Sequence, residues 1–410
     1  MKKRIIFVIN YFYPDYASTG QLLTELCLEL QQHFDITVIA VQPEAYKEQG
    51  KHKLFDVAYY EQIKVIRIRT PRVDKTSKRS RATFILFYFF AALCALMREK
   101  KAEIIYTISS PPILGGLIGA IGKIVRRTKH VYNIQDFNPE QAEAISYTKQ
   151  KWLFRLARKV DTWSCRWADH IVTVGRDMQQ TLYKRFEGGK VPPNSVINNW
   201  TDEKDIVPLA KDHAEVAAFL ADNGLENKFI VMYSGNLGLY YDLENIIRVT
   251  EAFKDHPRIA FVFVGDGAVK PAMMEFVEQH GIGNAYFLPF QDKAKLKYSL
   301  NAADAHLVVN QKGIKGVSVP SKIYGVMATG KPILGMLEQG SEASNLIRDA
   351  GCGLIMEPNQ YEELKRAIER LYIMNEDGRG QMGASGRLYL EKHLAKEQSL
   401  RKYKLLLESI

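Results

Sequence analysis

The sequence predicts an α/β protein built from two doubly wound domains, and three observations lead to this prediction. The chain has 410 residues, which is more than a single hydrophobic core usually serves. Short runs rich in β-branched residues alternate with segments whose apolar residues recur at helical spacing, a pattern typical of parallel sheets covered by helices. This pattern stops near residue 200 and starts again near residue 228, so we expect two such units.

The first unit is expected to begin with a strand at residues 4–10, RIIFVIN. A turn-rich loop follows it, and then a segment with an apolar stripe at helical spacing, QLLTELCLELQQHF. Further strands of this half are predicted at 36–41, 64–70, 103–109 and 130–136. Because helical segments follow several of them, these strands favour a mostly parallel sheet.

The second unit is expected to begin at residues 228–238, KFIVMYSGNLG, where a buried strand meets a glycine turn before the helical segment DLENIIRVTEAFK. Its other strands are predicted at 259–267, 285–290, 305–310 and 332–336. The paired prolines and asparagines of 191–202 suit an inter-domain connection. We therefore predict domains at 1–198 and 199–385, with a last helix at 386–410 that packs with either half, including back on the first.

Composition narrows the class of protein. Apolar residues make up 46% of the chain and charged residues 25%, as in ordinary folded domains, so disorder is not expected. The four cysteines show no C-x-x-C pair and indicate small core residues in a reducing compartment. The nine histidines show no ligand spacing and no carboxylate cluster stands out, so we predict no catalytic metal and no cofactor.

The net charge of +10 leaves an acidic partner open, whether nucleic acid, an anionic membrane or a phosphorylated substrate. A basic run, with Lys75, Lys78, Arg79 and Arg81, precedes an uncharged stretch at 82–97. This stretch is too short for a spanning helix. It predicts either a buried helix or an interfacial helix whose stripe of Phe84, Phe87, Tyr88 and Ala91 dips into lipid, and no export signal precedes it.

Loops after the strands are the places to search for a ligand, because open α/β sheets bind ligands beyond the carboxyl ends of their strands. In the first loop, Ser18, Thr19 and Gly20 precede a helix whose free N–H groups attract phosphate, although a simple helix cap needs the same residue types. Two glycine turns of the second half also allow close approach of a diphosphate, or are plain tight turns. They contain Gly235, Asn236 and Gly238, and Gly265, Asp266 and Gly267.

The segment at 316–334 carries the strongest signal. Pro320-Ser321-Lys322 is expected to open a helix that ends at Gly330, with Pro332 starting a short strand. Ser321 and Lys322 would then lie at the positive end of a helix dipole, where both side chains can meet phosphate. The alternative is a helix cap with a solvated lysine.

Gln135 and Asp136 end a predicted strand of the first half. A carboxylate at this edge can accept a hydrogen bond from a sugar hydroxyl or take a proton from an acceptor hydroxyl. The alternative for Asp136 is the N-cap of the next helix.

Seven motifs in order resemble retaining glycosyltransferase family 4, and within it the bacterial O-antigen and capsular polysaccharide transferases of the fucosamine-transferase kind. They span nearly the whole chain and read YFYPDYASTGQ, QDFNPE, VINNWTD, YSGNLG, FVFVGDG, SVPSKIYGVMATGKPIL and GSEASNLIRDAGCGL. The resemblance implies a GT-B fold of two Rossmann-like domains, cytoplasmic sugar transfer with retention of configuration, and no metal.

By this resemblance, the loops at Ser18–Gly20 and Gly235–Gly238 would flank the diphosphate, Lys322 would balance its charge, and Gly265–Gly267 with Phe290 would lie near the nucleotide. Gln135 and Asp136 would contact the acceptor or the donor sugar. The sequence departs from the family where Asn236 replaces an arginine and Tyr241 or Asp242 a lysine, and where Val317 and Gly325 replace two glutamates. Lys322, or Lys312 or Lys315, would supply the missing charge, and Glu342 a ribose-binding carboxylate.

The function expected is the transfer of a sugar from a nucleotide diphosphate donor, UDP by the resemblance, to a polyprenyl-diphosphate-linked saccharide in surface polysaccharide synthesis. The protein would work on the inner face of the cytoplasmic membrane, with peripheral contact through 75–97. A nucleotide-sugar epimerase of the same fold is the alternative within enzymes. A basic nucleic-acid-binding protein is another alternative, although the basic residues form no known nucleic-acid motif and we expect no nucleic-acid partner.

Overall fold

The computed structural model of the chain describes residues 2–15, 18–43, 53–72, 77–145 and 150–410. The chain divides into two compact units. The first comprises Met1–Asn198 with Leu400–Ile410, and the second Asn199–Ser399. Each unit is a sheet with helices on both faces, so the fold class expected from the sequence is confirmed.

The first unit contains an eight-stranded sheet in the order β3-β4-β2-β1-β5-β6-β7-β8. Every neighbouring pair is parallel except β3 and β4, which form an antiparallel hairpin. The strands are β1 Arg4–Val8, β2 Asp35–Val41, β3 Phe55–Tyr60, β4 Ile63–Ile68, β5 Ile104–Ile108, β6 Lys129–Ile134, β7 His170–Thr173 and β8 Asn194–Val196. The central strands β1 and β5 are buried on both faces, which explains their continuous apolar sequences.

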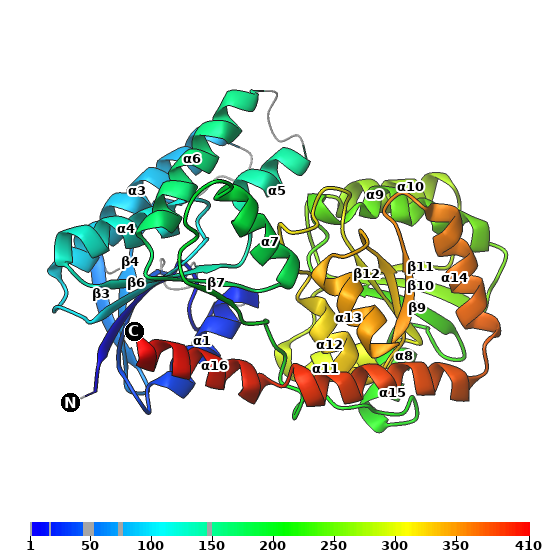
Figure 1. Cartoon of the computed structure of the whole chain (residues 1–410). Coiled ribbons are helices and arrows are strands. Elements are labelled where there is room, and N and C mark those ends of the chain that lie inside the picture. Colours follow the sequence, from blue (N-terminus) through cyan, green and yellow to red (C-terminus); the bar gives the residue numbers. More distant parts are fainter. Residues whose placement is uncertain (1, 16–17, 44–52, 73–76, 146–149) are drawn as a thin grey trace. The chain divides into compact units, whose positions relative to one another are not determined.

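Helices cover both faces of this sheet (Figure 1). One face carries α3 (Lys78–Arg98), α4 (Leu114–Arg126) and α6 (Lys151–Trp167), while α1 (Ser18–Leu30) and α16 (Lys396–Ser409) lie on the other. The remaining helices of the unit are α5 (Asn138–Ala144) and α7 (Arg176–Arg185). α4 packs between α3 and α6, so these three helices form one layer.

The second unit contains a six-stranded, fully parallel sheet in the order β11-β10-β9-β12-β13-β14. Its strands are β9 Phe229–Ser234, β10 Ile259–Val264, β11 Ala285–Leu288, β12 Ala305–Val309, β13 Ile333–Met336 and β14 Gly353–Met356. Alternate residues of β9 enter different cores, since Val231 and Tyr233 pack on one side and Ile230 and Met232 on the other. This double burial requires the β-branched and aromatic run seen in the sequence.

Helices cover both faces of the second sheet as well. They are α8 Ala214–Asp222, α9 Leu243–Ile246, α10 Lys270–Gln279, α11 Lys293–Asn301, α12 Lys322–Thr329, α13 Glu342–Ala350, α14 Tyr361–Ile373 and α15 Glu376–His393, with 3-10 helices η1 Leu239–Tyr241 and η2 Ile247–Phe253. The helix expected at 242–254 is therefore one α-helical turn that continues as a 3-10 helix. The single helix expected at 386–410 is wrong, because α15 ends where Leu394 is buried in the core and α16 begins two residues later.

The proposed lipid-facing stripe of α3 is also wrong. Tyr88 and Ala91 are buried and pack with Leu96 and with Ile118 of α4 in the core of the first unit, and Phe87 packs against that core. The buried-helix alternative therefore holds for this stripe. Of the basic run before it, Lys75 lies outside the described residues, as do the side chains of Lys78 and Arg81, while Arg79 is exposed. Among the described residues, none of the helices combines the length and hydrophobicity needed to cross a bilayer.

Candidate active site

The two glycine turns of the second unit interlock at the carboxyl ends of β9 and β10. The Gly235 N–H donates to the Val264 carbonyl, and the Leu237 N–H donates to the Asp266 carbonyl. Gly265 has a φ of +140°, and a Cβ there would lie 2.0 Å from the Gly235 carbonyl oxygen. Only glycine fits at this contact. The two turns therefore form one surface of backbone without side chains over Gly235 and Gly265.

Lys322 lies against this surface. Its Nζ is 3.5 Å from the centroid of the Tyr233 ring and 4.2 Å from that of Tyr241. A Cβ on Gly235 would be 3.6 Å from the same nitrogen. Within the described part of the chain, this nitrogen is buried and has no hydrogen-bond partner. Burial holds the pKa of Lys322 well below its usual value, because it penalises the charged form.

A buried lysine nitrogen whose partners in the described part of the chain are two aromatic faces is an unusual arrangement, since buried charges are normally paired. Ring quadrupoles offset part of the desolvation cost. The Tyr233 hydroxyl donates to the Asn236 carbonyl, so the same tyrosine fixes the glycine turn and faces Lys322. The arrangement provides a cation, backbone and aromatic surface that an anion entering the turn can contact.

Helix α12 begins as the sequence predicted. Ser321 is its N-cap residue and Gly330, with a φ of 63°, its C-cap. The aliphatic residues Ile323, Val326 and Met327 anchor it in the core, so its first turn is fixed at the sheet edge. Lys322 is the first residue of the helix, where the helix dipole favours negative charge.

The other donor-site candidates of the second unit lie in different surroundings. Phe290 is 59% exposed, and its ring edge would be 3.3 Å from a Cβ on Gly265, so it borders the glycine turns. Asp266 instead lines an open pocket of about 750 Å³ between α10 and β11. Glu342 is buried in the first turn of α13, after β13. Lys312 is exposed, and Lys315 donates to the Gln339 carbonyl.

In the first unit, Gln135 and Asp136 follow β6 as expected. Both backbone N–H groups donate to the Ser109 hydroxyl after β5, which fixes the turn. The N-cap of α5 is Phe137, so the N-cap alternative for Asp136 is wrong. Desolvation raises the pKa of Asp136 to about 6, a value that suits a group exchanging protons near neutral pH.

Gln135 belongs to a hydrogen-bonded chain that reaches the C-terminal helix. Its side-chain amide donates to Asn133 Oδ1, and Asn133 Nδ2 lies 2.6 Å from the hydroxyl oxygens of both Tyr106 and Tyr403. Tyr403 comes from α16, so the last helix helps to position the end of β6.

The loop after β1 combines a tight helix start with close backbone packing. A Cβ on Gly20 would lie 2.9 Å from Tyr11 Cβ, so packing alone requires a glycine there. The Thr24 hydroxyl donates to the Gly20 carbonyl and accepts from the Tyr13 N–H. Thr19 is half-buried in the first turn of α1, and the side chain of Ser18 lies outside the described residues.

The structure thus brings together one candidate set in the second unit, namely Gly235, Asn236, Gly238, Gly265, Gly267, Phe290, Ser321 and Lys322. The candidates Gln135, Asp136, Thr19 and Gly20 follow strands β6 and β1 of the first. Sequence reasoning missed Tyr233 and Tyr241 as partners of Lys322. The signal available was their position on either side of the glycine turn. No group of three or more His, Cys, Asp or Glu side chains suited to a metal ion occurs among the described residues.

Comparison with known proteins defines the class. The model described as "Glycosyl transferase 4-like domain" matches residues 19–200, and the model described as "Glycosyl transferases group 1" matches residues 217–388. The fold and these matches define the chain as a glycosyltransferase with the GT-B fold. More particularly, its first half is similar to a glycosyl transferase 4-like domain and its second half to the group 1 glycosyl transferases.

Two curated relatives agree with this assignment. WbjE of Pseudomonas aeruginosa, named as a probable glycosyltransferase, is 28% identical over 344 residues, which is 81% of each chain. WcaI of Escherichia coli strain K12, named as a colanic acid biosynthesis glycosyl transferase, is 30% identical over 57% of this chain and 56% of its own. The transferase prediction is therefore confirmed over the epimerase and nucleic-acid alternatives.

Solved structures share the fold over the full chain. Sucrose-phosphate synthase from Thermosynechococcus elongatus has a TM-score of 0.78 at 14% identity, covering 100% of this chain and 99% of its own. HepE from Anabaena, solved in complex with UDP and glucose, has a TM-score of 0.74 at 15% identity and covers 100% of both chains. At these identities the likeness concerns the fold.

Proposed function

We propose that the protein transfers a sugar, with retention of configuration, from a UDP-sugar to a lipid-linked saccharide in surface polysaccharide synthesis. The name of WcaI, which refers to colanic acid biosynthesis, supports this class of product. The complexes of HepE with UDP and glucose and of a trehalose-6-phosphate protein of E. coli with UDP-2-fluoro glucose support a UDP donor.

The observation that carries the proposal is the buried Lys322 nitrogen beside the glycine turns, which has no hydrogen-bond partner among the described residues. In the reaction, the bond between the anomeric carbon and the β-phosphate oxygen breaks, and negative charge grows on the departing diphosphate. Lys322 and the first N–H groups of α12 would stabilise that charge more in the transition state than in the ground state. The backbone of Gly235 and Gly265 leaves room for the phosphates to approach.

The acceptor hydroxyl would attack the anomeric carbon from the face that the diphosphate leaves. Its proton passes to the departing phosphate oxygen, so no protein nucleophile is required. Tyr241 or Asp242 stands where the resemblance expects a lysine, and the Tyr241 ring contacts Lys322. Lys322 of α12 would thus supply the positive charge that the family has at this position.

We assign further roles to the neighbouring candidates. The exposed ring of Phe290 next to Gly265 offers a face on which the base can stack. Asp136, with its raised pKa, and Gln135 would hydrogen-bond to the sugar or the acceptor. Because Lys322 and α12 balance the charge of the diphosphate in this proposal, the reaction requires no metal. We place it at the inner face of the cytoplasmic membrane, where a polyprenyl-linked acceptor is available.

The experiment that tests the donor assignment is thermal unfolding of the purified protein with UDP, GDP, CMP or NAD. A ligand that binds only the folded state raises the unfolding temperature. We expect a rise with UDP that is lost in Lys322→Met. A rise with GDP alone would change the donor class, and the absence of any rise with UDP would refute the UDP assignment.

A further inference from the structure

The excess positive charge of the chain is concentrated in one helical layer of the first unit. Helices α3, α4 and α6 contain eleven lysine and arginine residues and a single carboxylate, Asp161. Their excess of ten positive charges equals the net charge of the whole chain, so the rest of the protein is balanced. The single carboxylate is buried and forms an ion pair with Arg185, so it does not reach the surface.

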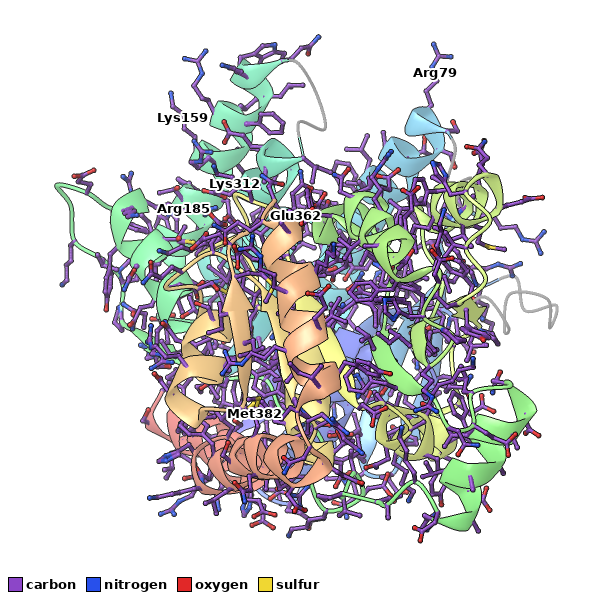
Figure 2. The ribbon with its side chains drawn as sticks, turned by 90° about the vertical axis from the view of Figure 1, so that its right-hand side faces the viewer. Arg79, Lys159, Arg185, Lys312, Glu362 and Met382 are labelled. Atoms are coloured by element: carbon purple, nitrogen blue, oxygen red, sulfur yellow. The ribbon has the colours of Figure 1, made fainter. Side chains whose placement is uncertain are left out.

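Helix α6 exposes large apolar side chains on one face. Trp152, Leu156, Trp163 and Trp167 are 54%, 52%, 38% and 42% exposed. Their spacing of four, seven and four residues places them on one stripe of an α-helix. The exposed cations Arg155, Lys159 and Arg166 border this stripe, and Figure 2 shows Lys159 extending away from the ribbon.

The neighbouring helices of the layer also expose apolar side chains. Ile124 and Val125 of α4 are 44% and 63% exposed, and Leu86 and Phe90 of α3 are 59% and 65% exposed. Arg79, at the start of α3, also extends outward (Figure 2). The exposed acidic residue nearest in sequence to α6 is Glu143 of α5, which pairs with Arg158 on the side of α6 away from the tryptophans.

We propose that this layer, which we call the α6 face, docks on an anionic lipid bilayer with α6 lying at the level of the headgroups. Tryptophan is favoured at membrane interfaces, because its ring is apolar and its N–H polar. Arginine and lysine beside it attract anionic lipids. A membrane therefore complements both the apolar and the charged parts of the α6 face, whereas the earlier expectation relied on a stripe of α3 that is buried.

This inference deepens the proposed function, since it names the surface on which a lipid-linked acceptor would be met. Its test uses neither donor nor acceptor. If the protein binds vesicles but not UDP, only the donor assignment is refuted. If it binds UDP but not vesicles, only this inference is refuted.

The tryptophans provide a direct measurement. Three of the four tryptophans of the chain lie on α6, and the fourth, Trp200, is buried. We would titrate the full chain with vesicles of brominated phosphatidylcholine, with or without brominated phosphatidylglycerol, and record tryptophan fluorescence. Bromine quenches only at close range, so we expect quenching with the anionic vesicles, reduced by added salt, and little with the neutral ones.

Matched charge reversals then locate the contact. Arg155→Glu with Lys159→Glu replaces two exposed cations of α6 with carboxylates. The loss of each cation should weaken partitioning by about fivefold, and the repulsion of each added carboxylate should weaken it further. The control is Arg401→Glu with Lys402→Glu, two exposed cations of α16 on the opposite face of the sheet, which should change partitioning less than twofold. Thermal unfolding of both variants verifies that they remain folded.

Several outcomes would overturn the inference. One is quenching that is absent or equal for neutral and anionic vesicles. Another is equal weakening by the α6 and α16 reversals. A stable dimer that dissociates when Trp152 and Trp163 are changed to serine would show that a second copy covers the α6 face. Tryptophan quenching by a single-stranded RNA oligonucleotide, competing with vesicles, would assign the face to nucleic acid.

Discussion

Replacing Lys322 with methionine is predicted to change stability and UDP affinity in opposite directions. In the free protein, the Lys322 nitrogen contacts the Tyr233 and Tyr241 rings at 3.5 and 4.2 Å and has no hydrogen-bond partner in the described part of the chain. Each ring contact contributes about 1–2 kcal/mol, while burying an unpaired cation costs several kcal/mol. Methionine has a similar volume and packs well on aromatic rings. The variant should therefore be as stable as the parent or more stable, by up to about 2 kcal/mol.

UDP binding should weaken in the same variant. A hydrogen bond to a charged group contributes about 1.5–3 kcal/mol, which corresponds to roughly a 10- to 150-fold rise in Kd. Isothermal titration calorimetry with UDP measures the affinity. Thermal unfolding measures stability, and for a domain of this size 1 kcal/mol moves the midpoint by about 2–4 °C.

The pH dependence of stability and of UDP binding follows from the lowered pKa of Lys322. Between that pKa and its ordinary value of 10.5, the unfolded chain binds more protons than the folded protein, so this group makes stability rise with pH. A bound diphosphate would restore the charge, and UDP binding in that window should take up a proton. Calorimetry in buffers of different ionisation enthalpy detects the uptake, which should vanish in Lys322→Met.

The control is Lys254→Met, which removes an exposed lysine from the same unit before β10, at the opposite edge of the sheet. It should leave stability and UDP affinity unchanged. If Lys322→Met destabilised the free protein by several kcal/mol, or bound UDP like the parent, the assignment of an anion site at this nitrogen would be wrong.

Three other changes test the remaining parts of the structure. Asp136→Asn should lower transfer at least about 10-fold, because an amide replaces the ionised carboxylate that would accept a hydrogen bond from the sugar or the acceptor. It should also abolish the rise of kcat/KM through pH 6, measured as a pH profile. Because burial raises the pKa of Asp136, its contribution to stability should be present below pH 3.8 and lost as the pH rises through about 6. Gly265→Ala should lower the unfolding temperature by more than 5 °C, which corresponds to a loss of about 2–3 kcal/mol in stability, because the new Cβ meets the Gly235 carbonyl. The control is Gly380→Ala, which lies in a helix with open space around it and should raise the unfolding temperature slightly. Tyr403→Phe should cost about 1–2 kcal/mol in denaturant unfolding, because Asn133 loses a buried partner, and an unchanged midpoint would contradict that role.

The sequence predicted most of the strands that are buried on both faces, and it also predicted the half-buried edge strand β11. The short strands β7 and β8 were missed, although β7 is buried. β1, β5, β9 and β10 have continuous apolar sequences because helices cover both sides of the sheet. β3 was missed because it is an edge strand with exposed Val57 and Tyr59, so its sequence shows no burial pattern. β14, with only four residues and an initial glycine, shows a similarly weak pattern.

The position of Lys322 could be predicted, but its surroundings could not. Proline, serine and glycine mark the two ends of α12 through local backbone preferences, and the structure has these ends where the sequence placed them. The aromatic partners of Lys322 come from β9 and η1, more than 80 residues earlier in the chain. Only the parallel pairing of β9 with β12 brings these segments to one sheet edge.

Helices α3 and α6 show why an apolar stripe does not by itself identify a membrane contact. Both contain apolar residues at helical spacing, yet the stripe of α3 with Tyr88 and Ala91 is core. In α6 the tryptophans share the exposed side with Arg155 and Lys159, and a stripe bordered by cations cannot be buried without desolvating them. Basic residues within the same helical turns as the apolar stripe therefore indicate which face meets an anionic surface. Basic residues that precede the helix in sequence do not.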